Sequence, residues 1–140
     1  MKARIKWAEK AAFIAESGSG HAIVIDGPPD IGGRNLGPRP MEVLLMGVGA
    51  CSTVDVVYIL QKARQAVTDC YVEMDSKRAE TEPKVFTDIH MHFVVTGRNL
   101  AENHVKRAVE LSAEKYCSAS IMLKRGGVNV TYGYEIRAAE

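Results

Sequence analysis

The chain has 140 residues, of which 46% are hydrophobic and 25% charged, the balance of an ordinary soluble globular protein. Its 18 Lys and Arg against 17 Asp and Glu leave a net charge of +1, so nothing in the charge predicts a nucleic-acid or anionic-membrane partner. The length predicts a single domain over residues 1–140. The opening MKARIKWAEK lacks the apolar run of a signal peptide, and three cysteines do not make a disulfide framework, so we expect a cytoplasmic protein.

Three short strands are predicted at the N-terminus. Residues 2–7 alternate polar and apolar side chains, residues 11–16 and 21–26 are further strand-like runs, and Ser-Gly-Ser-Gly at 17–20 is typical of a hairpin turn. Short connections of this kind predict an antiparallel meander. The Gly- and Pro-rich residues 27–37 then predict a loop, either a plain connector or part of a site.

A long helix is predicted over residues 40–64. Pro40 suits the first helical position, Lys62 and Arg64 suit the last turn, and no charged residue occurs from 43 to 54. Gly47, Gly49 and polar residues interrupt the run before the roughly 20 apolar residues that a membrane span needs. The pattern therefore predicts a buried core helix, which carries Cys51 near its middle.

The second half of the chain predicts strands at 68–79 and 85–95, a helix at 100–116 opened by an Asn99–Glu102 capping box, a short helix at 118–125 and a last strand at 128–137. The order βββ-α-ββ-α(α)-β predicts an α+β fold of antiparallel sheet packed on central helices. Because one sheet covers only one side of a helix that is apolar all round, we expect a homodimer that covers the rest.

Two histidines on one strand, His90 and His92, share a face, where they can bind a metal or simply meet solvent. No cysteine or carboxylate follows at the spacing of a zinc site, so the solvated face is the favoured interpretation and no cofactor is predicted.

The cysteines carry the candidate chemistry. Asp55 lies one helical turn after Cys51, and both its charge and burial raise a thiol pKa, so activation of Cys51 requires a cation or donor from elsewhere. The candidate cations are Arg39, Arg34 and Arg4. Cys117 lies between two helices, where the amides that open the second favour a thiolate. Cys70, in a strand, is interpreted as core filling.

The segments PMEVLLMGVGACSTVDVVYIL and LSAEKYCSASIML resemble the two cysteine motifs of the osmotically inducible protein C and organic hydroperoxide resistance (OsmC/Ohr) family, and the chain most resembles its YhfA-like branch. The resemblance extends over nearly the whole chain. It implies an intertwined homodimer with two active sites at the subunit interface, in which Cys51 attacks an organic or lipid hydroperoxide and Cys117 then forms a disulfide with it. A dithiol reductant of the lipoyl or thioredoxin type would restore both thiols.

The family also has a Glu ten residues before the first cysteine, which orients an activating Arg. Here Met41 holds that position, and the neighbouring acid is Glu42, so Glu42 and Arg39 are the candidate activating pair. Two alternatives to the hydroperoxide reductase stay open: a dimer that binds a small apolar ligand without catalysis, and a redox sensor.

Overall fold

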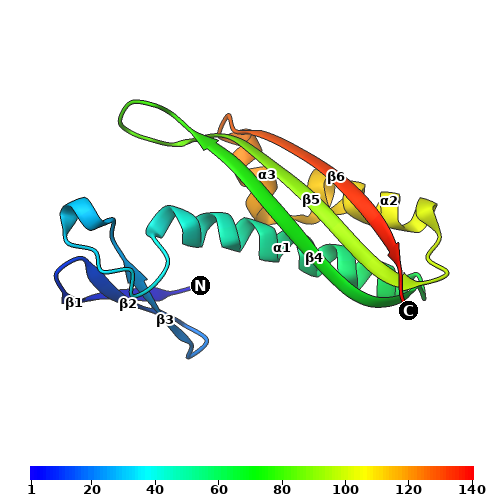
Figure 1. Cartoon of the computed structure of the whole chain (residues 1–140), viewed down its shortest axis with the longest axis horizontal. Helices are drawn as coiled ribbons and strands as arrows, with labels where there is room; N and C mark the ends of the chain where they lie inside the picture. The colour runs from blue at the N-terminus through cyan, green and yellow to red at the C-terminus, as the bar shows by residue number, and fades with distance from the viewer. The chain divides into compact units, whose positions relative to one another are not determined.

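In the computed structural model, which describes residues 1–140, the chain forms two compact units, Met1–Met46 and Gly47–Glu140. We call them the N-terminal and C-terminal units. Helix α1 (Pro40–Lys62) runs through the boundary between them (Figure 1). The prediction that residues 1–140 make a single domain stays a prediction.

The N-terminal unit is built on a three-stranded meander. Strands β1 (Ala3–Glu9), β2 (Ala12–Ser17) and β3 (Ala22–Asp26) pair antiparallel in that order, as the alternation predicted. Strand β1 is exposed along its whole length, and only Ala11, Ala12 and Asp26 are buried in this unit. The unit therefore encloses almost no apolar core of its own.

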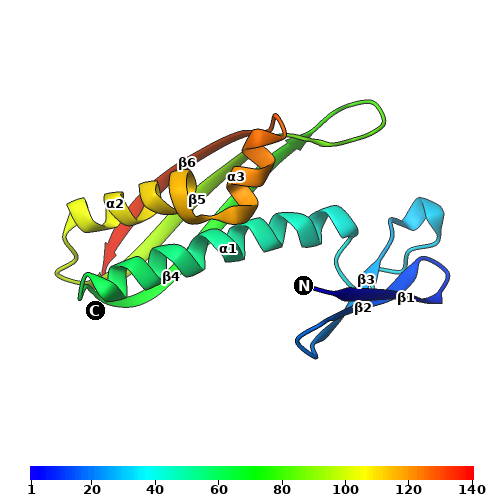
Figure 2. The same ribbon diagram turned by 180° about the vertical axis from the view of Figure 1, so that it is seen from behind.

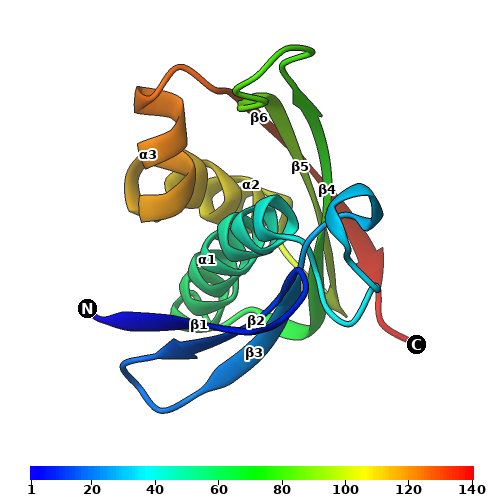
Figure 3. The same ribbon diagram turned by 90° about the vertical axis from the view of Figure 1, so that its left-hand side faces the viewer.

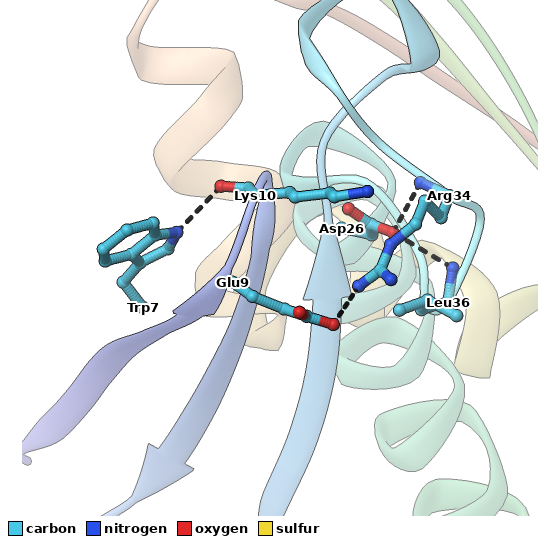
Figure 4. A network of polar contacts seen from close by, with 6 residues as sticks. All are labelled: Trp7, Glu9, Lys10, Asp26, Arg34 and Leu36. Carbon is cyan, nitrogen blue, oxygen red and sulfur yellow. Dashed lines mark hydrogen bonds and ion pairs between the residues drawn. The ribbon is translucent and has the colours of Figure 1, made fainter.

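Asp26, at the end of β3, organises the Gly- and Pro-rich loop (Figure 4). Its Oδ2 accepts hydrogen bonds from the backbone N–H groups of Arg34 at 2.9 Å and Leu36 at 3.2 Å, and these amides lower the pKa of the carboxyl group. Gly33 is required for the same turn, because a Cβ atom there would lie 1.7 Å from the Gly27 carbonyl oxygen. The hydrogen bonds of Asp26 and the close approach at Gly33 thus define the conformation of the loop.

The C-terminal unit holds a mixed sheet. Strands β4 (Ala66–Arg78) and β5 (Phe86–Arg98) pair antiparallel, and β6 (Asn129–Ala138) pairs parallel with β5 (Figure 1). The α+β class is confirmed, but the expectation of purely antiparallel pairing is wrong for β6. The reason is the helical connection between β5 and β6, which carries the chain back to the end where β5 began.

Helices cover one face of this sheet (Figures 2 and 3). They are the second part of α1, α2 (Glu102–Leu111), a π-helical turn η2 (Ser112–Tyr116) and α3 (Ser118–Arg125). Ile89, Met91, Phe93 and Val95 alternate along β5, and all four are buried. The core consists of residues that are at most 1% exposed, chiefly Ile89, Met91, Phe93, Val95, Val48, Val56, Leu60, Val105 and Val109.

The start of α2 differs from the prediction. The helix begins at Glu102 after Ala101, which makes no side-chain cap, and Asn99 has a left-handed φ of 49°, so the predicted Asn99–Glu102 capping box is wrong. The Gln65 side chain supplies the missing contact instead, because its Oε1 accepts the Ala101 N–H at 2.9 Å. A residue remote in sequence has replaced the local cap.

Helix α1 is long and apolar enough to cross a membrane by length and composition, a test that the core helix of a soluble protein also passes. Five of its residues, from Val48 to Leu60, are buried. Several apolar side chains of the same helix are exposed, including Met46 at 58%, Val54 at 67% and Tyr58 at 57%. The helix is therefore covered on one side only within a single chain.

Candidate functional site: a buried pair of thiols

Cys51 lies on α1 where the helix approaches strand β4 closely. Gly49 makes this approach possible, because a Cβ atom there would lie 3.2 Å from Met74 Sδ and 3.3 Å from Val72 Cγ1. The Cys51 side chain is partly exposed, whereas its neighbour Ser52 is fully buried. The helix thus presents a thiol that remains open to solvent at the edge of the core.

Cys117 is placed by the π-helical turn that follows α2. Its backbone N–H donates to the Ser112 carbonyl at 2.9 Å, which widens the helix by one residue and ends it at Cys117. Cys117 is then the N-cap of α3, and its Sγ accepts the Ser120 N–H at 3.4 Å. The prediction that the amides opening this helix favour Cys117 as a thiolate has its geometric basis here.

The fold brings the two thiols together, although they are 66 positions apart in the sequence. The two thiols are close enough for each to shift the pKa of the other. The Ser52 hydroxyl lies 3.0 Å from Cys117 Sγ and 3.4 Å from Met91 Sδ. Because a hydroxyl has one proton to donate, the shorter contact assigns it to Cys117.

The two sulfurs have opposite electrostatic environments. Burial raises the pKa of Cys51, and the negative charges of Cys117 and Asp55 raise it further, against one amide donor from Ala119. Burial also acts to raise the pKa of Cys117, but hydrogen bonds from Ser120, Ser52 and Cys51 outweigh it and hold this pKa below its ordinary value. The hydrogen-bond donors around Cys117 therefore favour a negative charge on this sulfur.

Asp55 lies beside the pair, as its spacing from Cys51 predicted. Burial raises the pKa of its carboxyl group, and the Ser112 hydroxyl, 3.4 Å from Oδ2, opposes this rise. The same Ser112 hydroxyl lies 3.0 Å from the Ser52 carbonyl oxygen. Asp55 also borders a pocket of about 450 Å³ that is mostly apolar. The other lining residues are Tyr58, Ile59, Lys62, Leu111 and Tyr116.

Glu42 and Arg39, the predicted activating pair, meet at the first turn of α1. The Arg39 backbone N–H donates to Glu42 Oε2 at 2.9 Å, so the carboxylate caps the helix, and both side chains are exposed. The hydrogen-bond partners of the two sulfurs all come from residues 51–120. An activating role for Glu42 and Arg39 stays a prediction.

The other candidate arginines have acidic partners within the N-terminal unit. Arg34 forms an ion pair with Glu9 (Figure 4), and Arg4 lies 3.8 Å from Glu16. Both contacts are at the surface, where an ion pair contributes little to stability.

The remaining candidates lie on β4 and β5. Burial raises the pKa of Cys70 to about 11, which suits a structural thiol. His90 Nδ1 lies 2.7 Å from the Thr131 hydroxyl, and His92 Nε2 lies 3.5 Å from Glu135 Oε2. Each histidine thus has its own polar partner on strand β6.

Three buried serines around Cys117 were missed from the sequence: Ser52, Ser112 and Ser120. For two of these serines the sequence does contain a feature that could have indicated their role. Ser112 occupies a position in the apolar stripe of the predicted second helix, and Ser120 follows Cys117 at the spacing of a residue that bonds to a helix cap. No sequence feature indicated Ser52, because a serine inside a long apolar helix is as typical of close helix packing as of a functional site.

Comparison with known proteins identifies relatives of the whole chain. A family model described as OsmC-like protein matches residues 32–133. Protein YhfA of Escherichia coli K12 is 52% identical over 139 residues, which cover 99% of this chain and 100% of YhfA. A crystal structure of a hypothetical protein from Aquifex aeolicus is 32% identical with a TM-score of 0.86, over 99% of this chain and 97% of that one.

More distant structures share the fold. An organic hydroperoxide resistance protein OsmC from Legionella pneumophila is 20% identical with a TM-score of 0.70, over 96% of this chain and 95% of that one. The match to the family model spans most of the chain, and YhfA matches along its full length. The chain therefore belongs to the OsmC-like protein family.

Proposed function

We propose that the chain is a thiol-dependent reductase of organic hydroperoxides, with Cys51 and Cys117 as its redox pair. The observation that carries this proposal is that two thiols lie near one another, one partly exposed and the other bonded to the buried Ser52 hydroxyl. Once one of two neighbouring thiols has been oxidised to a sulfenic acid, the other can condense with it to a disulfide. Membership of the OsmC-like family supports a role of the peroxiredoxin type in stress defence.

Cys51 is the attacking residue in this proposal, because its side chain is the accessible one of the two. Its sulfur attacks the O–O bond and becomes a sulfenic acid, and the alcohol leaves. The Cys117 sulfur then attacks Cys51 Sγ, a disulfide forms and water leaves. A dithiol of the lipoyl or thioredoxin type reduces the disulfide. The neighbouring thiol protects the sulfenic acid from further oxidation.

The pocket beside Asp55 supports a proposal for the substrate class. Its walls come from Tyr58, Ile59, Leu111 and Tyr116, which suit an apolar substituent on the peroxide. A solved structure of the same fold from Elizabethkingia anophelis is also named an organic hydroperoxide resistance protein. We infer that alkyl or lipid hydroperoxides are reduced in preference to hydrogen peroxide.

We further propose that the chain acts as a homodimer. In the N-terminal unit Ile5 is 58% exposed and Trp7 64%, and on α1 Val54 is 67% exposed. A stable monomer rarely leaves so much apolar surface in water, and two-fold dimers are the commonest way to cover it.

The test is the consumption of cumene hydroperoxide in the presence of a dithiol reductant. Wild type and Cys70→Ser turn over, Cys51→Ser does not, and hydrogen peroxide is consumed more slowly. Cys70→Ser is the matched control, because it removes a thiol on another element. Equal activity of Cys51→Ser and wild type would disprove the proposal.

The same pocket supports a second candidate, binding of a small apolar ligand without catalysis. It would be favoured by an inactive wild type that binds a fluorescent fatty acid. A Cys51–Cys117 disulfide that forms without turnover would favour a redox sensor instead.

A further inference from the structure

The apolar pocket beside Asp55 also has a lysine in its wall. The pocket, of about 450 Å³, is lined by residues of α1, α2 and η2, which lie side by side on the sheet (Figures 2 and 3). Asp55 and Lys62 are the two charged residues of this lining. Both belong to α1, where seven positions separate their Cα atoms by about 10 Å along the helix axis. The pocket therefore has an acidic end and a basic end.

Both ends lie on the face of α1 that carries Cys51. Positions 51, 55, 58 and 62 follow one another at the spacing of a single helix face. Cys51 precedes Asp55 by one turn, so the acidic end of the pocket is the end nearer the thiol. A molecule that extends along this face from Lys62 therefore points toward Cys51.

Lys62 is a cation without an anionic partner. Its Nζ lies 5.3 Å from the centre of the Tyr58 ring, which is part of the pocket wall, and none of the ion pairs of the chain includes it. Lys115 is placed in a similar way, with its Nζ 5.4 Å from the centre of the Tyr116 ring. The two tyrosines that line the pocket thus each have an ammonium group beside them, which favours an anion at this end.

We propose that the pocket binds the acyl chain of a fatty acid hydroperoxide and that the Lys62 ammonium binds its carboxylate, with the peroxide directed toward Cys51. The inference rests on the proposed hydroperoxide reduction and adds a residue that selects among its substrates. A lysine is a single point charge, which suits a head group with one negative charge. The opposite orientation would place the carboxylate beside Asp55, where two like charges repel each other.

Binding of the head group is tested by fluorescence titration of the full chain with cis-parinaric acid and with its methyl ester. The two probes have the same acyl chain, and only the acid carries a charge. Wild type should bind the acid more tightly than the ester. Lys62→Met removes the ammonium and keeps an unbranched side chain, so the acid should bind about fivefold more weakly, the upper range for an exposed ion pair, and the ester should bind as before. Lys62→Arg should restore the preference for the acid.

Lys106→Met is the matched control. Lys106 is an exposed lysine of α2 that pairs with Glu110 at 3.9 Å and does not line the pocket. This variant loses the same charge, yet its preference for the acid should equal that of wild type.

The role of Lys62 in turnover is tested with linoleic acid hydroperoxide and its methyl ester. In Lys62→Met the KM for the acid should rise about fivefold while kcat is unchanged, because an exposed ion pair that forms equally in the ground state and the transition state affects binding alone. The KM for the ester should not rise.

Equal affinity of wild type for the acid and the ester overturns the inference, and so does an equal loss of both in Lys62→Met. A loss of the acid preference in Lys106→Met also overturns it, because the net charge rather than Lys62 would then be responsible. A protein that prefers the acid through Lys62 but consumes no hydroperoxide overturns the proposed function instead.

Discussion

The Ser52 hydroxyl lies 3.0 Å from the Cys117 sulfur, although 65 positions separate the two residues in the sequence. This contact joins the core of α1 to the start of α3, and both of its members are fully buried. A buried hydroxyl must find a partner or lose free energy, so the contact fixes the side chain of Ser52 as well as that of Cys117. Ser52 therefore fixes the position of Cys117, the buried member of the thiol pair.

The charge of Asp55 should suppress the reactivity of Cys51. Asp55→Asn removes that charge, which acts to raise the pKa of Cys51. We expect Cys51 in this variant to react with iodoacetamide about threefold faster near neutral pH, as for one unit charge partly screened by water. Glu110→Gln on the exposed face of α2 is the control. Equal rates for Asp55→Asn and wild type would show that the carboxylate does not act on the thiol.

The buried Ser112 hydroxyl should contribute measurably to stability. It lies 3.0 Å from the Ser52 carbonyl oxygen and 3.4 Å from Asp55 Oδ2. Ser112→Ala removes the one hydroxyl proton that these two acceptors share, so the free energy of unfolding should fall by about 1–3 kcal/mol in urea titrations. Ser118→Ala, at an exposed position of α3, should change it by less than about 0.5 kcal/mol. Similar losses in both variants would contradict the assigned network.

Cys70 should make stability depend on pH in the alkaline range. Burial raises its pKa in the folded state from the ordinary value of 9.0 to about 11, so between these values the folded chain binds more protons than the unfolded chain. Stability must then fall as the pH rises, by at most about 1.4 kcal/mol for each pH unit. Urea titrations across this range should show wild type losing stability relative to Cys70→Ala. A constant difference between the two would contradict burial of the thiol.

A charge on the exposed side of α1 should dissociate the proposed dimer. Val54 is 67% exposed in the single chain, and Val54→Asp would place a carboxylate in the expected interface, where its burial is costly. Sedimentation should show a wild-type dimer and a Val54→Asp monomer. Val85→Asp, at a residue 53% exposed just before β5, should remain dimeric. A monomeric wild type would rule out the dimer.

Much of the fold followed from local patterns. The alternation of residues 2–7 and the apolar run of residues 43–54 predicted β1 and α1 because each depends on side chains close in the sequence. The direction of β6 did not follow, because strand pairing depends on where the preceding helices leave the chain. The cap of α2 by Gln65 is likewise a tertiary contact, which no local motif encodes.

The candidate site, like the fold, was predicted only where it depends on residues close in the sequence. The sequence indicated Cys51, Cys117 and the raised pKa of Cys51 beside Asp55, and the structure brings these residues together. It did not indicate the contact between Ser52 and Cys117, because the sequence of the π-helical turn that places Cys117 is typical of an ordinary helix.

The redox pairing of Cys51 with Cys117 is tested most directly by peptide mass mapping after one equivalent of cumene hydroperoxide, without added reductant. The account predicts the loss of the two thiol hydrogens and a single cross-linked peptide that joins Cys51 to Cys117. It also predicts that Cys70 remains a free thiol. Unchanged Cys51 and Cys117 thiols after the peroxide has been consumed, or a disulfide through Cys70, would contradict it.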